Sequence, residues 1–504
     1  MLDPSTLAAL GASAPWALGR GVSLGLLSQA HALTHPSSTA VIDKQGPLTW
    51  GEVDRRANSL ARFLESNGVS EPGGVATLLR NGREALETFI AAQKLGSTFR
   101  PLNTWAKGDE LAGLIKAANP SVIVFDARHF PPESLAKNAL RILVGSGESG
   151  VPYEGLVAGD TRPPIPFIGG KGEGRVVINT SGTTGAPKGA FRDPAAAGVN
   201  ALAALLTIVP FEKKDTLLCP APIFHSFGIG CVTIAVVMGA TVVLPDVFDP
   251  TEFFESIEQH RVTAAAVTPL MLHRLLESSD SAVGLDLSSL RILVCSGSLL
   301  TDEVRAKTMD LFGPVLYDLY GSTEAGWISI ATPSDIGTRP GTVGKPVPGV
   351  EVKILNDSGE QAEPGEVGEI HVQSNVEFAG YTTGQARRGP EGLMPLGDLG
   401  VFDADGFLFV KGRADDLVVI GGENVFPSEI ERVISLLPGV REVAVVGVPD
   451  EEYGQVLAAF VEGDVTKGEV LEKCRQGLSS FKVPRHVEIV DSIPSTPSGK
   501  LLKR

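Results

Sequence analysis

Residues 176–189 read Val-Val-Ile-Asn-Thr-Ser-Gly-Thr-Thr-Gly-Ala-Pro-Lys-Gly, an apolar run followed by a loop rich in glycine and hydroxyl groups. The apolar run predicts a buried strand that leads into the loop. Glycines let backbone N–H groups approach an anion, hydroxyls donate hydrogen bonds to it, and Lys188 adds a positive charge. The stretch therefore predicts a polyphosphate site mounted on a strand, and its natural ligand is a nucleotide triphosphate.

The spacing of this loop differs from that of a P-loop NTPase. A Walker A sequence has two glycines separated by four residues, with Lys and then Ser or Thr directly after the second glycine. Here Ala186 and Pro187 stand between Gly185 and Lys188, and Gly189 follows the lysine. A P-loop is therefore excluded. A flexible linker, the usual meaning of a Gly/Ser/Thr-rich segment, stays as the alternative.

Length, charge and cysteine usage limit the class of protein. With 504 residues, 43% of them apolar, the chain is long enough for two or three compact units of a soluble enzyme. A net charge of −16 argues against a nucleic-acid partner, which needs a basic surface. The cysteines have neither zinc-site nor disulfide-framework spacing; they are Cys219, Cys231, Cys295 and Cys474. No signal peptide is evident, so we expect a reducing, cytoplasmic setting.

Residues 227–244 carry no charged residue and are nearly long enough to span a bilayer. Glycines interrupt the segment, Pro245 ends it, and aspartates rather than Lys or Arg flank it. We expect a buried helix, a turn at Gly239 and Ala240, and a short strand at residues 241–244. His31 and His35 have helical spacing without an evident third ligand, so we expect them at the surface.

Strand and helix patterns alternate through the first two thirds of the chain. Thr49 and Glu52 have the spacing of a capping box, which predicts a helix that stops near Gly68. Further strands and a helix are predicted; the strands cover residues 75–79, 121–126, 176–178, 264–267 and 291–295, and the helix covers residues 83–95. This alternation predicts a layered α/β structure with mainly parallel strands.

The pattern changes twice toward the C-terminus. Beyond Gly341, short strands with glycine turns at residues 352–355, 368–372 and 407–410 predict a β-rich part. After Gly412 a smaller α+β pattern follows, with a helix from about residue 428 and strands at 442–447 and 456–461. We expect one domain over residues 1–412 and a second over residues 413–504.

Several short segments carry groups that suit a nucleotide. The sequence Tyr-Gly-Ser-Thr-Glu at residues 320–324 offers a ring that can stack on adenine and a carboxylate that can bind Mg²⁺. Asp398 offers an acceptor, and Arg413 offers a forked set of donors. Each segment alone is also typical of an ordinary turn or a solvated charge.

In order along the chain, these segments resemble the signatures of the adenylate-forming enzymes, a family of acyl-CoA synthetases, peptide-synthetase adenylation domains and luciferases. The likeness runs from about residue 49 to residue 500, where Pro-Ser-Gly-Lys at 497–500 is similar to the closing motif. Leu396 departs from the family's Thr-Gly-Asp motif, although Asp398 is kept. The resemblance implies an α/β fold: a large N-terminal domain of layered sheets and helices with a β-rich subdomain, and a small mobile α+β C-terminal domain.

The resemblance also implies roles for single residues. Those expected to bind ATP are Thr180, Ser181, Gly182, Thr183, Thr184, Gly185, Lys188, Ser296, Gly297, Ser298, Tyr320, Gly321, Thr323, Asp398, Arg413 and Lys500. Thr184 and Glu324 would hold Mg²⁺, and with Lys500, which would reach the α-phosphate, they form the expected catalytic set. His225 and Gly321 would adjoin the acid, His225 by shaping its pocket rather than by acid/base chemistry.

Gly421 and Gly422 would face the pantetheine arm of CoA, and Asp415 would be the hinge between the domains. The implied reaction consumes ATP with Mg²⁺ to adenylate a carboxylic acid, and then passes the acyl group to CoA. A fatty acid is expected, because the motifs look most like those of bacterial fatty acyl-CoA synthetases. Two alternatives stay open: a fatty acyl-AMP ligase that loads a carrier protein, and a non-catalytic nucleotide-binding protein.

Overall fold

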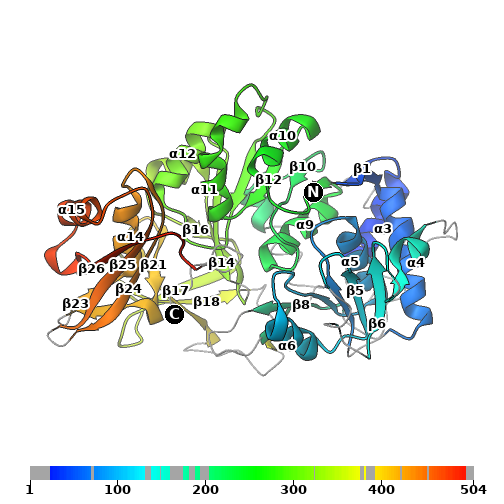
Figure 1. Ribbon diagram of the computed structural model, residues 1–504, viewed down its shortest axis with the longest axis horizontal. Helices are drawn as coiled ribbons and strands as arrows, with labels where there is room; N and C mark the ends of the chain where they lie inside the picture. The colour runs from blue at the N-terminus through cyan, green and yellow to red at the C-terminus, as the bar shows by residue number, and fades with distance from the viewer. Residues whose placement is uncertain are drawn as a thin grey trace.

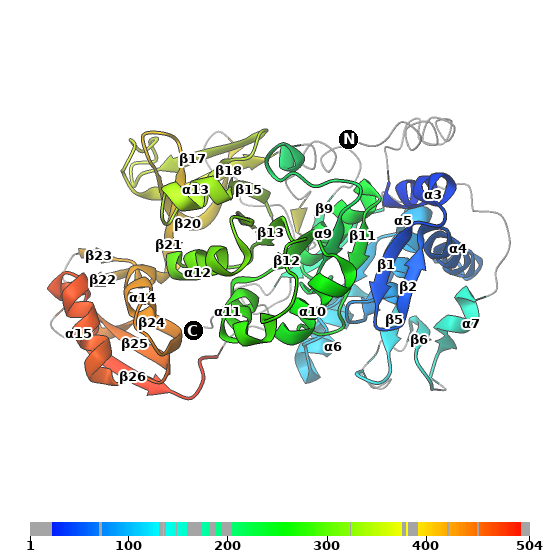
Figure 2. The same cartoon turned by 90° about the horizontal axis from the view of Figure 1, so that it is seen from above.

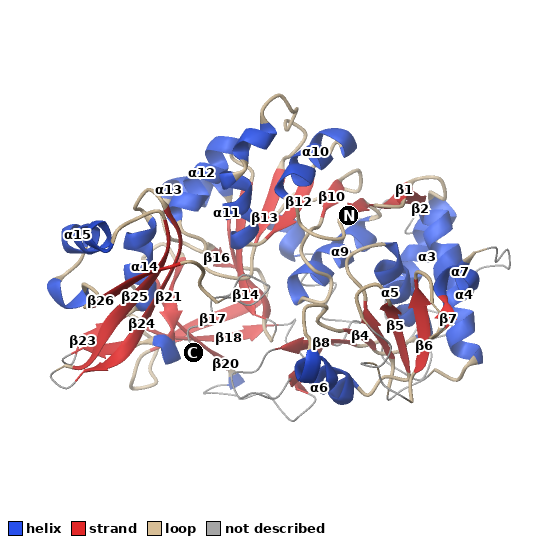
Figure 3. Cartoon of the chain, in the orientation of Figure 1, coloured by secondary structure: helices blue, strands red, loops and turns tan. Residues whose placement is uncertain are grey.

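The structure is a computed structural model, and two large sheets separated by helices dominate it (Figure 1). It describes residues 23–69, 73–130, 135, 138–147, 149–158, 174–180, 188–192, 204–322, 324–374, 380–381, 392–420, 423–450 and 453–494. Figure 3 shows helices on the outer side of both sheets as well as between them. The layers run helix, sheet, helix, sheet, helix, which confirms the predicted layered α/β class.

The first large sheet has eight strands within the described ranges, in the order β19-β9-β8-β4-β3-β5-β6-β7. Its strands are β3 (Val75–Leu78), β4 (Phe99–Pro101), β5 (Val122–Asp126), β6 (Leu140–Val144), β7 (Val151–Pro152), β8 (Val176–Thr180), β9 (Lys188–Arg192) and β19 (Gly380–Tyr381). Neighbouring strands in the run β8-β4-β3-β5-β6-β7 are all parallel. Strand β9, in contrast, is antiparallel to both of its neighbours, β8 and β19.

The second large sheet has nine strands in the described part of the chain, in the order β16-β15-β14-β13-β12-β10-β11-β1-β2. They are β1 (Thr39–Asp43), β2 (Gly46–Thr49), β10 (Thr216–Leu218), β11 (Thr241–Val243), β12 (Ala264–Val267), β13 (Ile292–Cys295), β14 (Leu316–Ser322), β15 (Gly326–Ala331) and β16 (Lys345–Pro346). The central pairs are parallel, so their carboxyl ends share one edge, where open α/β sheets bind ligands.

Helices fill the space between the two sheets. The largest apolar cluster joins residues of both sheets to α4 (Trp50–Ser66), α5 (Arg83–Leu95) and α9 (Ser226–Met238), while α3 (Leu24–Thr34) packs on all three helices. The outer faces are covered separately. The second sheet packs against α10 (Pro250–His260), α11 (Pro269–Glu277) and α12 (Asp302–Phe312), and the first against α6 (Gly108–Ala118). Two short helices, α7 (Tyr153–Val157) and α13 (Pro333–Thr338), complete this part.

Several local predictions are confirmed. The Thr49 hydroxyl accepts from the Glu52 N–H at 3.3 Å, and the Glu52 carboxylate accepts from the Thr49 N–H at 2.8 Å, which is the predicted capping box. Helix α9 ends at Gly239, whose φ of 68° is left-handed, and β11 follows. Within the described ranges, we find no helix with the length and apolarity that a bilayer crossing requires.

The β-rich part and the C-terminal part follow the two large sheets. A four-stranded antiparallel sheet contains β17 (Val350–Leu355), β18 (Gly368–Ser374), β20 (Met394–Phe402) and β21 (Leu408–Arg413). The C-terminal unit contains β22 (Val418–Ile420), β23 (Glu423–Val425), α14 (Pro427–Ser435), β24 (Val440–Asp450), β25 (Gly454–Gly463), α15 (Lys467–Gly477) and β26 (His486–Val490). Figure 2 shows this unit at the opposite end of the molecule from α3, α4 and α7. The predicted boundary at Gly412 falls in β21 and stays a prediction.

The surface prediction for His31 is wrong. Its side chain is buried, and Nε2 lies 3.0 Å from the Val236 carbonyl oxygen of α9. Burial lowers the His31 pKa to about 4, so the ring is neutral near pH 7. Gly239 makes this burial possible, because a Cβ there would lie 2.6 Å from His31 Cε1. His35, four residues on, is half-buried and contacts Lys213.

Candidate functional site

The predicted phosphate loop connects two paired strands. Val177 and Ile178 of β8 are 3% and 4% exposed, which confirms the predicted buried strand. Strands β8 and β9 are antiparallel, and Thr180 is the register partner of Lys188. The ladder therefore fixes the two residues that flank the loop, Thr180 and Lys188. Five of the loop's predicted ligands lie outside the described residues: Ser181, Gly182, Thr183, Thr184 and Gly185.

Three of the predicted nucleotide ligands meet in one contact. The Tyr320 hydroxyl donates to Asp398 Oδ2 at 2.6 Å, and an Arg413 guanidinium N–H donates to Asp398 Oδ1 at 3.1 Å. Tyr320 comes from β14, whereas Asp398 and Arg413 face each other across the β20–β21 pair. Burial and the Asp398 charge raise the pKa of Tyr320 well above its ordinary value, so the hydroxyl keeps its proton. A ring from one sheet is thus held against a carboxylate and a guanidinium from another.

The arginine is held through two of its nitrogens, Nη1 and Nε. Besides Asp398, Arg413 donates to the Leu396 carbonyl oxygen at 3.1 Å and to Asp415 Oδ1 at 3.3 Å. Asp415, the predicted hinge, lies in the single turn η4 (Ala414–Asp416) directly after β21. Leu396 stands where the family has a threonine, and here its backbone carbonyl accepts from Arg413.

The hairpin of β14 and β15 carries the second signature. Gly321 pairs with Trp327 after a register shift, and an added Cβ at Gly321 would lie 2.2 Å from the Gly326 carbonyl oxygen. Glu324 is half-buried in the turn, while Thr323 lies outside the described residues. Since Mg²⁺ is usually bound by one or two carboxylates together with substrate phosphates, a single glutamate at this turn fits a magnesium ion that arrives with ATP. Elsewhere in the described ranges, we find no His/Cys/Asp/Glu group of three or more with metal-site geometry.

Replacing Gly321 with alanine should disturb this hairpin. The new methyl group would overlap the Gly326 carbonyl, so the strands must separate and Tyr320 must move with them. We expect kcat/KM for ATP to fall about tenfold in a pyrophosphate-exchange assay. Gly337→Ala is the matched control, because nothing lies within 4 Å of the added methyl group there. An unchanged kcat/KM in Gly321→Ala would contradict the role of the hairpin.

Ser296, Gly297 and Ser298 follow β13 at the same sheet edge. The buried Ser296 hydroxyl donates to the Leu319 carbonyl oxygen at 2.8 Å and thereby ties the end of β13 to the strand that carries Tyr320. Gly297 is exposed with a φ of 114°, and Ser298 is exposed as well. The Ser296 side chain thus stabilises the fold through this hydrogen bond, whereas Gly297 and Ser298 are exposed and accessible to a ligand.

His225 lies in a cluster of rings at the start of α9. Its ring centroid is 4.4 Å from that of Phe224 and 5.6 Å from that of Trp105. Burial lowers the His225 pKa to about 4, and Nε2 has no hydrogen-bond partner among the residues that the structure describes. A neutral ring among aromatic groups fits the expected role of shaping an apolar pocket. The sequence did not predict that Trp105 lies beside His225, because the loop after β4 that contains Trp105 has no recognisable motif.

Gly421, Gly422 and Lys500 lie outside the described residues, so the expected pantetheine and α-phosphate contacts stay predictions. Lys188 and Thr180 are located by their backbone only.

Comparisons with known proteins agree with this geometry. A family model described as AMP-binding enzyme matches residues 28–382, and one described as AMP-binding enzyme C-terminal domain matches residues 429–500. The indoleacetate–CoA ligase of Aromatoleum aromaticum is 33% identical over 94% of this chain and 95% of its own length. The long-chain-fatty-acid–CoA ligase FadD13 of Mycobacterium tuberculosis is 28% identical over 95% of this chain and 97% of its own length.

A solved structure extends the likeness to three dimensions. The amide bond synthetase McbA from Marinactinospora thermotolerans has a TM-score of 0.84 and 30% identity, covering 95% of this chain and 98% of that chain. This similarity confirms the predicted fold class.

Proposed function

This chain belongs to the family of AMP-binding enzymes, and from that premise we propose that it is an AMP-forming ligase that joins a carboxylic acid to CoA. The contact among Tyr320, Asp398 and Arg413 carries the proposal. It brings together an aromatic face for adenine, an acceptor for ribose hydroxyls and a cation for phosphate. Two relatives named as acid–CoA ligases support the thioester product.

In the first half-reaction, a carboxylate oxygen attacks the α-phosphorus of ATP, and the bond to pyrophosphate breaks. The products are the acyl adenylate and pyrophosphate. Lys188 and Lys500 would offset the charge that accumulates on the phosphates, and Glu324 with Thr184 would hold Mg²⁺, which when bound supplies further positive charge. Positioning dominates such transfers, since little covalent help from the protein is needed.

In the second half-reaction, the thiolate of CoA attacks the acyl carbonyl carbon, and AMP leaves with the electrons of the broken acyl–phosphate bond. Lys500 and the pantetheine arm would compete for the space near the acyl group. We therefore propose that residues 413–504 form a unit that turns at Asp415 between the steps and brings Gly421 and Gly422 to the pantetheine arm.

Two classes of acid remain to be tested. The fatty acid that the motifs suggest is supported by the FadD13 relative. An aryl acid is supported by the more similar indoleacetate–CoA ligase and by the rings of Trp105, Phe224 and His225 at the start of α9. We favour the aryl acid, because planar rings stack edge to face on aromatic side chains more selectively than a flexible alkyl chain does.

The decisive experiment is an assay of carboxylate-dependent AMP release with ATP, Mg²⁺ and CoA. Acids from acetate through long-chain fatty acids to indoleacetate and cinnamates should be compared, with omission of CoA as the control. We expect AMP release to require both an acid and CoA, with the highest kcat/KM for an aryl acid. Release that needs a carrier protein or an amine instead of CoA would indicate a different acceptor. ATP binding without acid-dependent pyrophosphate exchange would indicate a non-catalytic nucleotide-binding protein.

A further inference from the structure

The backbone between β10 and α9 is buried and needs partners for its polar groups. This stretch covers residues 219–225, and we name it the His225 segment because His225 is its last residue. Cys219, Ala221 and Ile223 are 0%, 1% and 4% exposed. Buried N–H and C=O groups are almost always paired in folded proteins, so something must satisfy them. The segment has no regular secondary structure that could do so by itself.

One side chain satisfies three of these groups. Asn81 Nδ2 donates to the carbonyl oxygens of Cys219 and Ala221 at 3.1 and 3.0 Å, and Asn81 Oδ1 accepts from the Ile223 N–H at 3.0 Å. A primary amide offers two donors and one acceptor in a fixed plane. A single asparagine therefore fixes the path of the His225 segment over five residues.

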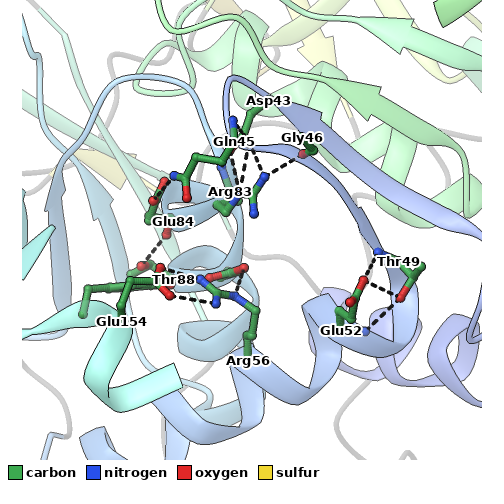
Figure 4. Close-up of polar contacts among 12 residues, drawn as sticks. Asp43, Gln45, Gly46, Thr49, Glu52, Arg56, Arg83, Glu84, Thr88 and Glu154 are labelled. Atoms are coloured by element: carbon green, nitrogen blue, oxygen red, sulfur yellow. Dashed lines mark hydrogen bonds and ion pairs between the residues drawn. The ribbon is translucent and has the colours of Figure 1, made fainter. Parts of the chain in front are cut away.

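Asn81 comes from the other large sheet. It follows β3, while the His225 segment follows β10, so its amide bridges the carboxyl ends of strands in two different sheets. Its own position is anchored two residues later, where the Arg83 N–H and Nε donate to the Asp43 carboxylate at 2.9 and 3.1 Å. Figure 4 shows this pair together with the bond from Arg83 to the Gly46 carbonyl oxygen. Asp43 ends β1 of the second sheet and Arg83 begins α5, so the anchor ties the connection from β3 to α5 to the second sheet.

The His225 segment has no room to relax on its other side. An added Cβ at Gly228 in the first turn of α9 would lie 2.2 Å from the Pro222 carbonyl oxygen. The Trp105 ring packs edge to face on Phe224 at 4.8 Å. The segment is thus held between α9, Trp105 and Asn81, and the Asn81 amide is the partner of three of its backbone groups.

We propose that Asn81 is a positioning residue that fixes the Phe224 and His225 rings for the acid before the acid binds. The inference rests on the proposed function, because it assumes that these rings adjoin the acid. Asn81 does not itself touch the reacting atoms. Its loss should therefore affect recognition of the acid and leave recognition of ATP unchanged.

The test compares Asn81→Ala with Asn58→Ala in the adenylation assay. Asn58 is a buried asparagine, and it donates to Asp54 within α4, away from the His225 segment. In Asn81→Ala, we expect KM for the acid to rise at least about tenfold while KM for ATP changes less than about twofold. In Asn58→Ala, both KM values should stay within about twofold of the wild type. Equal changes in the KM values of the two variants would mean that Asn81 only stabilises the fold, and they would overturn the proposal.

Hydrogen exchange tests the inference without activity. In the ligand-free wild type, the Ile223 amide should exchange slowly, and Asn81→Ala should speed it at least about tenfold, whereas Asn58→Ala should not. Asn81→Asp is the second variant, since it keeps an acceptor for Ile223 but loses both donors. Fast exchange of Ile223 in the free wild type would overturn the proposal even if no variant folds. If no acid supports AMP release, the proposed function fails, and exchange alone decides whether Asn81 fixes the segment.

Discussion

Replacing Asp398 with alanine should reduce kcat/KM for ATP about 100-fold, which corresponds to about 3 kcal/mol of lost binding and transition-state stabilisation. The carboxylate joins Tyr320 and Arg413, and its side chain is 17% exposed. Removal leaves the Tyr320 hydroxyl without its acceptor, and Arg413 Nη1 loses the carboxylate while it keeps the Leu396 carbonyl oxygen. The ribose loses its proposed acceptor at the same time.

The contributions can be separated with Tyr320→Phe. This variant keeps the ring and Asp398 and removes only the hydroxyl that donates at 2.6 Å. We expect a loss of about tenfold in kcat/KM for ATP, because one hydrogen bond to a charged group is removed. The two assays use pyrophosphate exchange at varied ATP with saturating acid. An Asp398→Ala variant with nearly wild-type kcat/KM for ATP would contradict both the site and the proposed function.

Local features of the fold were predictable because they depend on neighbours in the sequence. The capping box of Thr49 and Glu52 acts over three residues, and helix α5 has the predicted bounds of 83–95. Strand β12 also has its predicted bounds, since a short apolar run with no turn residue inside it favours a buried strand. These signals need no information about the rest of the chain.

Contacts between distant segments were not predictable in the same way. The Tyr320–Asp398 bond spans 78 positions, and resemblance to a family gave a role to each residue without showing that they touch. Asn81 has no motif, and its three partners lie about 140 positions later in the chain. A half-buried asparagine after a strand gives no sequence signal of such a bridge.

The error at His31 has a physical cause. A polar residue on a helix is usually exposed, but α3 also carries Leu26, Leu27 and Ala30, all less than 5% exposed. The helix packs on α4, α5 and α9, so even its histidine faces protein. The space for the ring depends on Gly239, and the sequence does not show that Gly239 lies opposite His31.

The largest effect on stability is expected from Arg56→Met. Arg56 Nε donates to Glu87 Oε1 at 2.6 Å, and its other nitrogens donate to Glu154 at 2.8 and 3.0 Å, as Figure 4 shows in part. Glu87 is fully buried, and its other oxygen accepts from the Tyr153 hydroxyl at 2.8 Å. Loss of the arginine leaves a buried carboxylate without its counter-charge, which costs about 3–5 kcal/mol. Urea unfolding followed by tryptophan fluorescence at pH 8 should detect this loss.

The pH dependence of this loss of unfolding free energy should show that the Glu87 charge causes it. Burial raises the Glu87 pKa to about 7, although Arg56 opposes this shift, so removal of Arg56 should raise the pKa further. At pH 5 Glu87 is protonated in the folded wild type and in the folded variant and needs no cation, so the loss should be smaller than at pH 8. Above pH 7 Glu87 ionises in the folded wild type, where Arg56 compensates its charge, while the folded variant must retain the proton or bury an unpaired charge, so the loss should grow by about 1.4 kcal/mol per pH unit.

The double variant Arg56→Met/Glu87→Gln provides the control. Its neutral amide can still accept from Tyr153 and has no charge to compensate, so it should recover about 2 kcal/mol at pH 8 relative to Arg56→Met. The difference from the wild type should also depend less on pH than that of the single variant. If Arg56→Met loses the same free energy of unfolding at pH 5 and pH 8, and the double variant recovers nothing, then packing of the arginine side chain rather than its charge stabilises the α4–α5 interface.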